Sequence, residues 1–120
     1  MFLRLYWSRI EPGSWQSVQD RYVELSKVEV PGRVARWVTQ DTNDPESIIT
    51  VTLWSSQAEI QAWEGSAQYE RSTAAMRPYL VGSQTVSLCE VKLEHPAGLL
   101  ASLLAAASRS NGTAFEVTCE

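Results

Sequence analysis

The sequence predicts one α+β domain in which four strands and two helices follow each other in the order β-α-β-β-α-β. Its length of 120 residues is close to that of a single domain. The charged (20%) and hydrophobic (44%) fractions are those of a globular protein. Along the chain, apolar residues switch between strand-like and helix-like spacing, and no repeat or low-complexity linker divides them.

The first two elements are a strand and a helix. Residues 2–10 are rich in aromatic and aliphatic types and end at the turn sequence Glu-Pro-Gly. Ser14 can cap the following helix, and Pro31-Gly32 ends the segment. The helix has one apolar face, made by Trp15, Val18, Tyr22 and Leu25.

Two further strands and a hairpin loop follow. Residues 33–40 and 48–54 have strand-like composition, and the polar turn sequence at 41–46 favours a hairpin between them. Arg36 and Trp37 must point to opposite faces, because strand side chains alternate.

The next segment predicts a broken helix and a last sheet strand. Ser56-Gln57-Ala58-Glu59 matches a capping box, which marks a helix start. Gly65-Ser66 predicts a break, and a second helical piece continues to Pro78. Residues 84–92 form the fourth strand. The order is that of a ferredoxin-like domain.

Residues 93–120 predict a helical extension of the same domain, which itself spans residues 1–92. Pro96 suits a first helical turn, and Asn111-Gly112 suits a helix end. Phe115 and Val117 alternate with polar residues, which allows a short last strand. An apolar stripe on the helix is made by Leu99, Leu100, Leu103 and Leu104.

A four-stranded sheet with two helices on one face leaves its other face bare. Large apolar residues on that face favour association, and a two-fold dimer, sheet against sheet, covers them. We therefore expect a homodimer that closes a dimeric α/β barrel, with Trp7 at its core because Trp7 faces away from Tyr6.

Composition excludes several classes of protein. The net charge is −4 and no basic run is present, so we expect no nucleic-acid partner. The longest apolar tract, residues 99–107, is too short to span a membrane. The first residues lack a signal peptide, so we expect a cytoplasmic protein. Cys89 and Cys119 fit buried, inert thiols, and a disulfide between them stays open.

The motifs in hand resemble those of the antibiotic biosynthesis monooxygenase family. The resemblance covers residues 2–92 and depends on the order and spacing of several short sequences. These are Glu11-Pro12-Gly13, Pro31-Gly32 leading into Arg36-Trp37, Asp44-Pro45, Thr50-Val51-Thr52-Leu53-Trp54, and Ala62-Trp63-Glu64 with Ser66 and Tyr69.

The resemblance implies a small dimeric protein with a pocket for an organic ligand. Family members include oxygenases that use O2 without a bound cofactor, and others degrade heme. It implies pocket positions at Tyr6, Trp63, Tyr69 and Thr73. We predict catalytic roles for Trp63, Tyr69 and Tyr6, and a substrate pocket lined by Trp37, Trp54, Thr73 and Met76.

Each of these residues also has a purely structural interpretation. The Trp63 N–H could orient a substrate oxygen, or Trp63 could only pack its helix onto the sheet. Tyr6 and Tyr69 could be core tyrosines, Trp54 a structural residue, and Met76 a gap filler.

No cofactor or metal is predicted. Heme-degrading relatives place a histidine where Thr73 stands here, and His95, the one histidine, fits a loop or cap. The chain also lacks a glycine-rich phosphate loop and a Cys-x-x-Cys pair. Three hypotheses remain. The first is a cofactor-independent monooxygenase acting on a small planar aromatic or quinol-like substrate, and the second is a non-catalytic module that binds a small ligand or a protein. The third is a protein that binds heme through another ligand.

Overall fold

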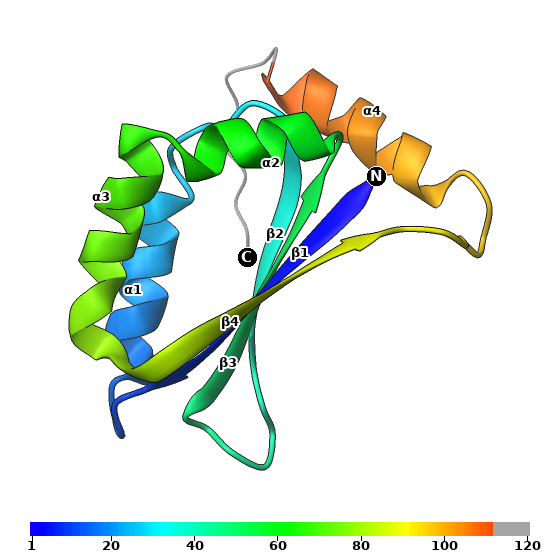
Figure 1. Ribbon diagram of the computed structural model, residues 1–120. Helices are drawn as coiled ribbons and strands as arrows, with labels where there is room; N and C mark the ends of the chain where they lie inside the picture. Colours follow the sequence, from blue (N-terminus) through cyan, green and yellow to red (C-terminus); the bar gives the residue numbers. More distant parts are fainter. Residues whose placement is uncertain (112–120) are drawn as a thin grey trace.

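A four-stranded antiparallel sheet forms the centre of the domain (Figure 1). The structure is a computed structural model that describes residues 1–111, with side chains as far as Ser108. The spatial strand order is β2-β3-β1-β4, which confirms the ferredoxin-like prediction. The strands are β1 (Phe2–Ile10), β2 (Arg33–Gln40), β3 (Ser47–Trp54) and β4 (Leu80–Glu90).

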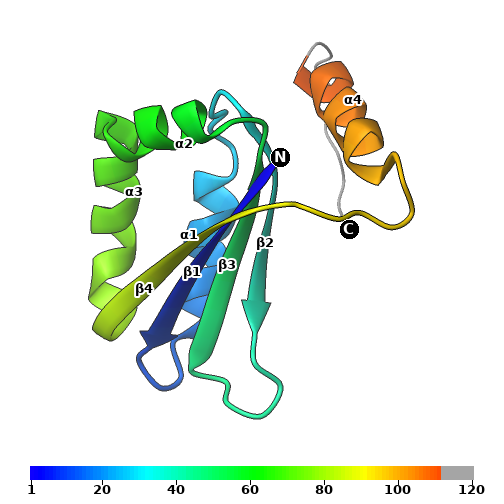
Figure 2. The same ribbon diagram turned by 45° about the vertical axis from the view of Figure 1, so that its right-hand side comes forward.

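Three helices cover one face of the sheet, and a fourth lies on the other side (Figure 2). The fourth helix, α4, packs beside β2 and is separated from the end of β4 by eight residues. A short 3-10 helix, η1 (Arg77–Tyr79), leads into β4. The α-helices are α1 (Trp15–Leu25), α2 (Gln57–Glu64), α3 (Ala67–Met76) and α4 (Leu99–Asn111).

Serine caps divide the second helical segment as the sequence predicts. The Ser56 hydroxyl accepts a hydrogen bond from the Glu59 N–H (3.2 Å) at the start of α2. At the break, Ser66 accepts from the Tyr69 N–H (3.2 Å) and donates to the Trp63 carbonyl (2.6 Å). Both caps satisfy backbone groups that a helix end leaves free, so α3 starts in a new direction directly after α2.

Three local predictions are wrong. Ser14 occupies the cap position of α1, but its hydroxyl donates to the Glu11 carbonyl (2.7 Å) instead of capping. The fourth strand starts at Leu80, not at residue 84, because Gly82 at φ +71° lets the chain continue pairing with β1 past an irregularity in register. Pro96 lies before α4, whose first turn is capped by the Glu94 carboxylate.

The helix-covered face contains two apolar clusters at opposite ends. One contains Ile10, Val18, Ile48 and Met76, and the other contains Val30, Trp54 and Ile60. All of these side chains are at most 8% exposed. Between the two clusters, the residues of β1 and β3 that face the helices are polar, and a pocket occupies this middle region.

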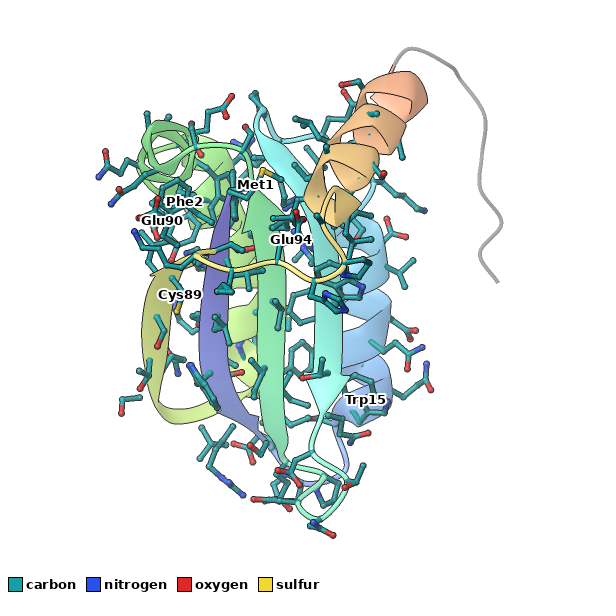
Figure 3. All side chains as sticks on the ribbon, turned by 90° about the vertical axis from the view of Figure 1, so that its right-hand side faces the viewer. Met1, Phe2, Trp15, Cys89, Glu90 and Glu94 are labelled. Carbon is teal, nitrogen blue, oxygen red and sulfur yellow. The ribbon has the colours of Figure 1, made fainter. Side chains whose placement is uncertain are left out.

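The opposite face of the sheet is open over most of its area (Figure 3). Trp7 and Trp37 lie on this face and are 42% and 47% exposed. The segment after β4 crosses in front of the strands near Glu94 and leads to α4 (Figure 3). This face of the sheet is therefore apolar and largely uncovered, as the sequence predicts. The segment after β4 and helix α4 lie on the same side of the sheet.

The terminal predictions have mixed outcomes. Cys89 is exposed, not buried, because it lies on β4, an edge strand. Cys119, any pairing of it with Cys89, and the expected strand around Phe115 and Val117 lie outside the described residues. Over residues 1–111, no helix has the length and apolar character needed to cross a bilayer.

Candidate functional site

A pocket of about 60 Å³ lies between the sheet and helices α1, α2 and α3. The sheet supplies its polar floor, and the helices supply aromatic and hydroxyl side chains. The residues that line it are Arg4, Tyr6, Tyr22, Leu25, Arg36, Thr50, Thr52, Trp63, Tyr69, Ser72, Thr73 and Met76.

Arg4 is the central charged group of the pocket and is only 5% exposed. Its Nε donates to Glu64 Oε2 (2.8 Å), and its Nη2 donates to the Tyr69 hydroxyl (3.2 Å). The guanidinium carbon lies 5.0 Å from the centroid of the Trp63 ring and 5.8 Å from that of Tyr6, within the range of a cation–π contact. A buried charge requires such partners, so Arg4 is held in place by α2, α3 and its own strand.

Trp63 combines firm packing with an unsatisfied donor. Its ring lies 5.3 Å from the Trp54 ring and 4.7 Å from the Tyr69 ring, the latter edge-on. Among the described side chains, its Nε1 is the buried polar atom without a hydrogen-bond partner. Leaving such a group unpaired costs about 1–3 kcal/mol, and a ligand oxygen that accepted from it would recover this energy.

Two cross-strand rows form the floor. Arg4, Thr52 and Arg36 stand opposite one another on β1, β3 and β2, and Tyr6 and Thr50 form the adjacent row. All point to the helix-covered face, because residues two apart on a strand share a face. The floor is therefore polar and hydroxyl-rich, in contrast to the apolar clusters on either side.

Tyr6 and Tyr22 are hydrogen-bonding groups, not anions, at neutral pH. Burial raises the pKa of Tyr22 and of Tyr6 above the usual value of 10. The Thr50 hydroxyl donates to the Tyr22 oxygen (3.0 Å). Both tyrosines keep their protons, so each presents an O–H to a ligand.

Arg36 is the second arginine of the pocket. Its guanidinium lies over the Tyr22 ring (5.7 Å to the centroid) and donates to Ser26 Oγ (3.3 Å). Burial lowers the pKa of Arg36, and burial together with the positive charge of Arg36 lowers the pKa of Arg33 to about 10. Both arginines remain charged at neutral pH, so this side of the pocket is positive.

The structure brings together five of the seven residues that we predicted for the site. Tyr6, Trp63, Tyr69, Thr73 and Met76 line the pocket. The other two do not.

Trp54 and Trp37 lie outside the pocket, each for a clear reason. Trp54 is fully buried, and its Nε1 donates to Thr52 Oγ1 (2.8 Å), so it has the structural role given as its alternative. Trp37 faces the open side of the sheet, because its neighbour Arg36 faces the pocket. The prediction that Trp37 lines the substrate pocket is wrong.

Sequence reasoning placed neither Arg4 nor Arg36 among the pocket residues. A signal for both was present. Thr50 and Thr52 in β3 alternate with aliphatic residues, and Arg4 and Tyr6 do so in β1. When two neighbouring strands have polar residues on the face that is covered by amphipathic helices, this pattern indicates a polar pocket instead of a continuous apolar core.

The pocket lining contains no imidazole and no thiol, the side chains that most often bind zinc or heme iron. Thr73 uses its hydroxyl to donate to the Glu70 carbonyl (3.0 Å). Over the described part of the chain, no group of three or more His, Cys, Asp or Glu side chains could hold a metal ion.

The fold and the pocket together define a class: a ferredoxin-like α+β domain with a small pocket, lined by aromatic side chains and two arginines, between sheet and helices. Residues 1–75 match the family model described as Antibiotic biosynthesis monooxygenase. The match covers more than half of the chain, and the protein belongs to this family.

Solved structures show the same fold at low sequence identity. A family protein from Bordetella bronchiseptica has a TM-score of 0.71 at 10% identity, with 77% of this chain and 97% of that one covered. One from Nitrosomonas europaea has a TM-score of 0.67 at 9% identity, covering 78% and 100%. One from Chloroflexus aurantiacus has a TM-score of 0.61 at 22% identity, covering 78% and 97%. A comparison with curated sequences finds no significant match.

Proposed function

We propose that the protein is a cofactor-independent monooxygenase that oxidises a small phenolic or quinol-like substrate with O2. The observation that carries the proposal is a pocket lined by both Arg4 and Trp63, whose buried indole N–H has no hydrogen-bond partner among the described residues. An N–H donor and a guanidinium beside one another favour an oxyanion, and aromatic walls favour a planar ring.

The chain's part in the reaction is to bind and stabilise the substrate anion. Arg4 and Trp63 lower the free energy of a phenolate or enolate relative to its neutral form. The anion then reduces O2, the substrate radical and superoxide combine to a hydroperoxide, and this loses water. The hydroperoxide forms at a ring carbon ortho or para to the substrate oxygen. In net terms a phenol and O2 give a quinone and water: that ring C–H becomes C=O, with one oxygen atom of O2 retained and the other released as water.

The proton released on binding needs an acceptor. Glu64 is the carboxylate held next to the pocket by Arg4, and its side chain is 38% exposed. It can therefore take a proton near the site and pass it to solvent.

The pocket must widen to hold a ring. Its volume of about 60 Å³ is smaller than the cavity of roughly 150 Å³ that holds benzene in another protein. Flexible lining side chains such as Arg36 and Met76 are the ones that can move. The proposal therefore favours substrates with one ring, or with one ring inserted, over fully enclosed fused rings.

Oxygen consumption tests the proposed reaction. Purified protein is mixed with a panel of hydroquinones, hydroxylated benzenes and anthrone-type compounds, and O2 uptake is followed together with product mass. We expect uptake with at least one compound and a product carrying one atom from labelled O2. No uptake across the panel would contradict the proposal.

We further propose that the protein acts as a homodimer joined through the open face of the sheet. Trp7 and Trp37 expose large apolar areas there, and covering them favours association. Light scattering at micromolar concentration should give twice the monomer mass, and Trp7→Glu should give a folded monomer. A monomeric parent protein would contradict this proposal.

A binding module on the same scaffold is the second candidate. The observation that favours it is the composition of the pocket, whose lining contains no histidine and no carboxylate to act as a general base. A module would bind members of the same panel without O2 uptake, so calorimetry on the panel separates the two functions.

A further inference from the structure

We propose that the ligand of this pocket is an aromatic carboxylate, with its acid group bound by Arg36 and its ring among the aromatic side chains. The inference deepens the proposed function, because it rests on the same pocket and names the chemical class of its substrate.

The charges lining the pocket do not balance. Arg4 is neutralised by Glu64 at 2.8 Å. Over the described residues, no carboxylate lies within ion-pair distance of Arg36. Together with burial, the uncompensated charge of Arg36 lowers the pKa of Arg33. The contacts of Arg36 are the Tyr22 ring and one serine hydroxyl. A half-buried guanidinium without a counter-charge is costly, and a bound anion removes that cost.

The geometry separates two anion-binding positions. Arg4 and Arg36 stand on either side of Thr52 in one cross-strand row. Their backbones are therefore about 9.5 Å apart, since neighbouring strands are separated by about 4.8 Å. Once the pocket has widened, a para-substituted benzene ring between the two arginines would present a phenolic oxygen to Arg4 and Trp63 and a carboxylate to Arg36.

The chemistry of arginine fits a carboxylate at the Arg36 end. A guanidinium offers two parallel N–H donors, which match the two oxygens of a carboxylate. The Arg4 guanidinium is already committed to Glu64 and Tyr69. Arg36 donates only one hydrogen bond, at 3.3 Å to Ser26, so most of its donors are available.

Access also points to Arg36. It belongs to β2, an edge strand, and its weak contact with Ser26 gives little restraint. Movement of this side chain would enlarge the pocket at the same time as it met the incoming anion. Arg36 would then supply both the additional pocket volume and the counter-charge for the anion.

The test compares two probes of equal shape, para-hydroxybenzoate and its neutral isostere para-hydroxybenzamide. Binding is measured by calorimetry and by quenching of tryptophan fluorescence. We expect the parent protein to bind the carboxylate about tenfold or more tightly than the amide, as a charge-assisted hydrogen bond implies. Arg36→Gln should abolish that preference while leaving the melting temperature close to that of the parent.

Arg9→Gln is the matched control. Arg9 is also a strand arginine, but it lies on the open face and pairs with Asp44 at 2.9 Å. Its removal should leave the preference intact. Equal binding of the two probes by the parent protein, binding of neither, or a preference that survives Arg36→Gln would each overturn the inference. A carboxylate preference without O2 uptake by any carboxylated phenol would instead overturn the proposed oxygenase function and leave this inference standing.

Discussion

Ile48 and Thr52 lie four residues apart on β3, face the same helices, and have opposite surroundings. Around Ile48 are Ile10, Val18 and Met76, which exclude water and contain no polar side-chain group except a thioether. Thr52 instead lines the pocket, together with a buried arginine, three tyrosines and Trp63, whose indole N–H has no partner among the described residues.

The difference shows which region contributes stability and which contributes function. Burial of aliphatic side chains stabilises the fold by about 1.5–3 kcal/mol for each residue. Buried charges and unpaired donors contribute little or are unfavourable. Natural sequences break packing rules mainly at functional sites, so the polar stretch between two apolar clusters is the place to expect binding.

The largest effect on stability is expected in the apolar cluster. Ile48→Ala removes a side chain that is 1% exposed and should lower the unfolding free energy by about 2–5 kcal/mol. Urea denaturation measures this loss. The affinity of the folded protein for a pocket ligand should change little. If the free energy of ligand binding fell as much as the free energy of unfolding, the apolar cluster and the pocket would not have separate roles.

A smaller effect on stability, with a large effect on binding, is expected from Arg4→Met. The variant leaves Glu64 unpaired, but its side chain is 38% exposed and remains hydrated, so the unfolding free energy should change by about 1 kcal/mol or less. Calorimetry with a phenolic ligand should show binding weakened about tenfold or more. A large drop in melting temperature with unchanged affinity would assign Arg4 to the structural core.

The pocket tyrosines should make stability fall at high pH. Burial raises the pKa of Tyr22 and Tyr6 in the folded protein, so the unfolded chain loses these protons first as the pH rises through 10. The unfolded state then binds fewer protons than the folded state, and the unfolding free energy decreases. Denaturation between pH 8 and about 11 should show this decrease, and the variant with both tyrosines changed to Phe should show a shallower one. An identical slope in both proteins would contradict the assignment.

The smallest effect is expected when heme is added to the protein and its absorbance is followed. Because Thr73 stands at the position implied for an axial histidine and no imidazole lines the pocket, added heme should produce no tight, stoichiometric Soret band. Titration with heme, followed by absorbance, measures binding. Saturation at one heme per chain would show that the pocket chemistry has been assigned wrongly.

The sequence predicted the fold well because most elements depend on local signals. Periodicity placed β1, β2 and the helix break at Gly65, and each agrees with the structure. The start of β4 was missed because it depends on pairing with β1 across a long sequence separation. Such pairing is a tertiary property that composition does not reveal.

The site was predictable only in part. Trp63 and Tyr69 were found, and the caps at Ser56 and Ser66 bring their helix faces onto the sheet. Arg4 was missed because an arginine in a strand is normally solvated, and only the structure shows Glu64 paired with it 60 positions away. Long-range pairs between charged residues leave no local pattern.

Two tryptophan variants test whether Trp54 stabilises the fold while Trp63 binds the ligand. Trp54 and Trp63 pack against each other, but the Trp54 N–H is bonded to Thr52, while the Trp63 N–H has no partner among the described residues. Trp54→Phe should cost about 1–3 kcal/mol of stability through the lost hydrogen bond, with activity per folded molecule nearly unchanged.

Trp63→Phe should show the reverse. Stability should fall by about 1.5 kcal/mol or less, while turnover or ligand binding loses on the order of 3 kcal/mol. Melting temperature and O2 uptake, or ligand affinity, are measured on both variants in parallel. We expect Trp54→Phe to lose mainly stability and Trp63→Phe to lose mainly activity or affinity. This expectation would be contradicted if Trp63→Phe were the less stable variant and its activity merely followed the folded fraction.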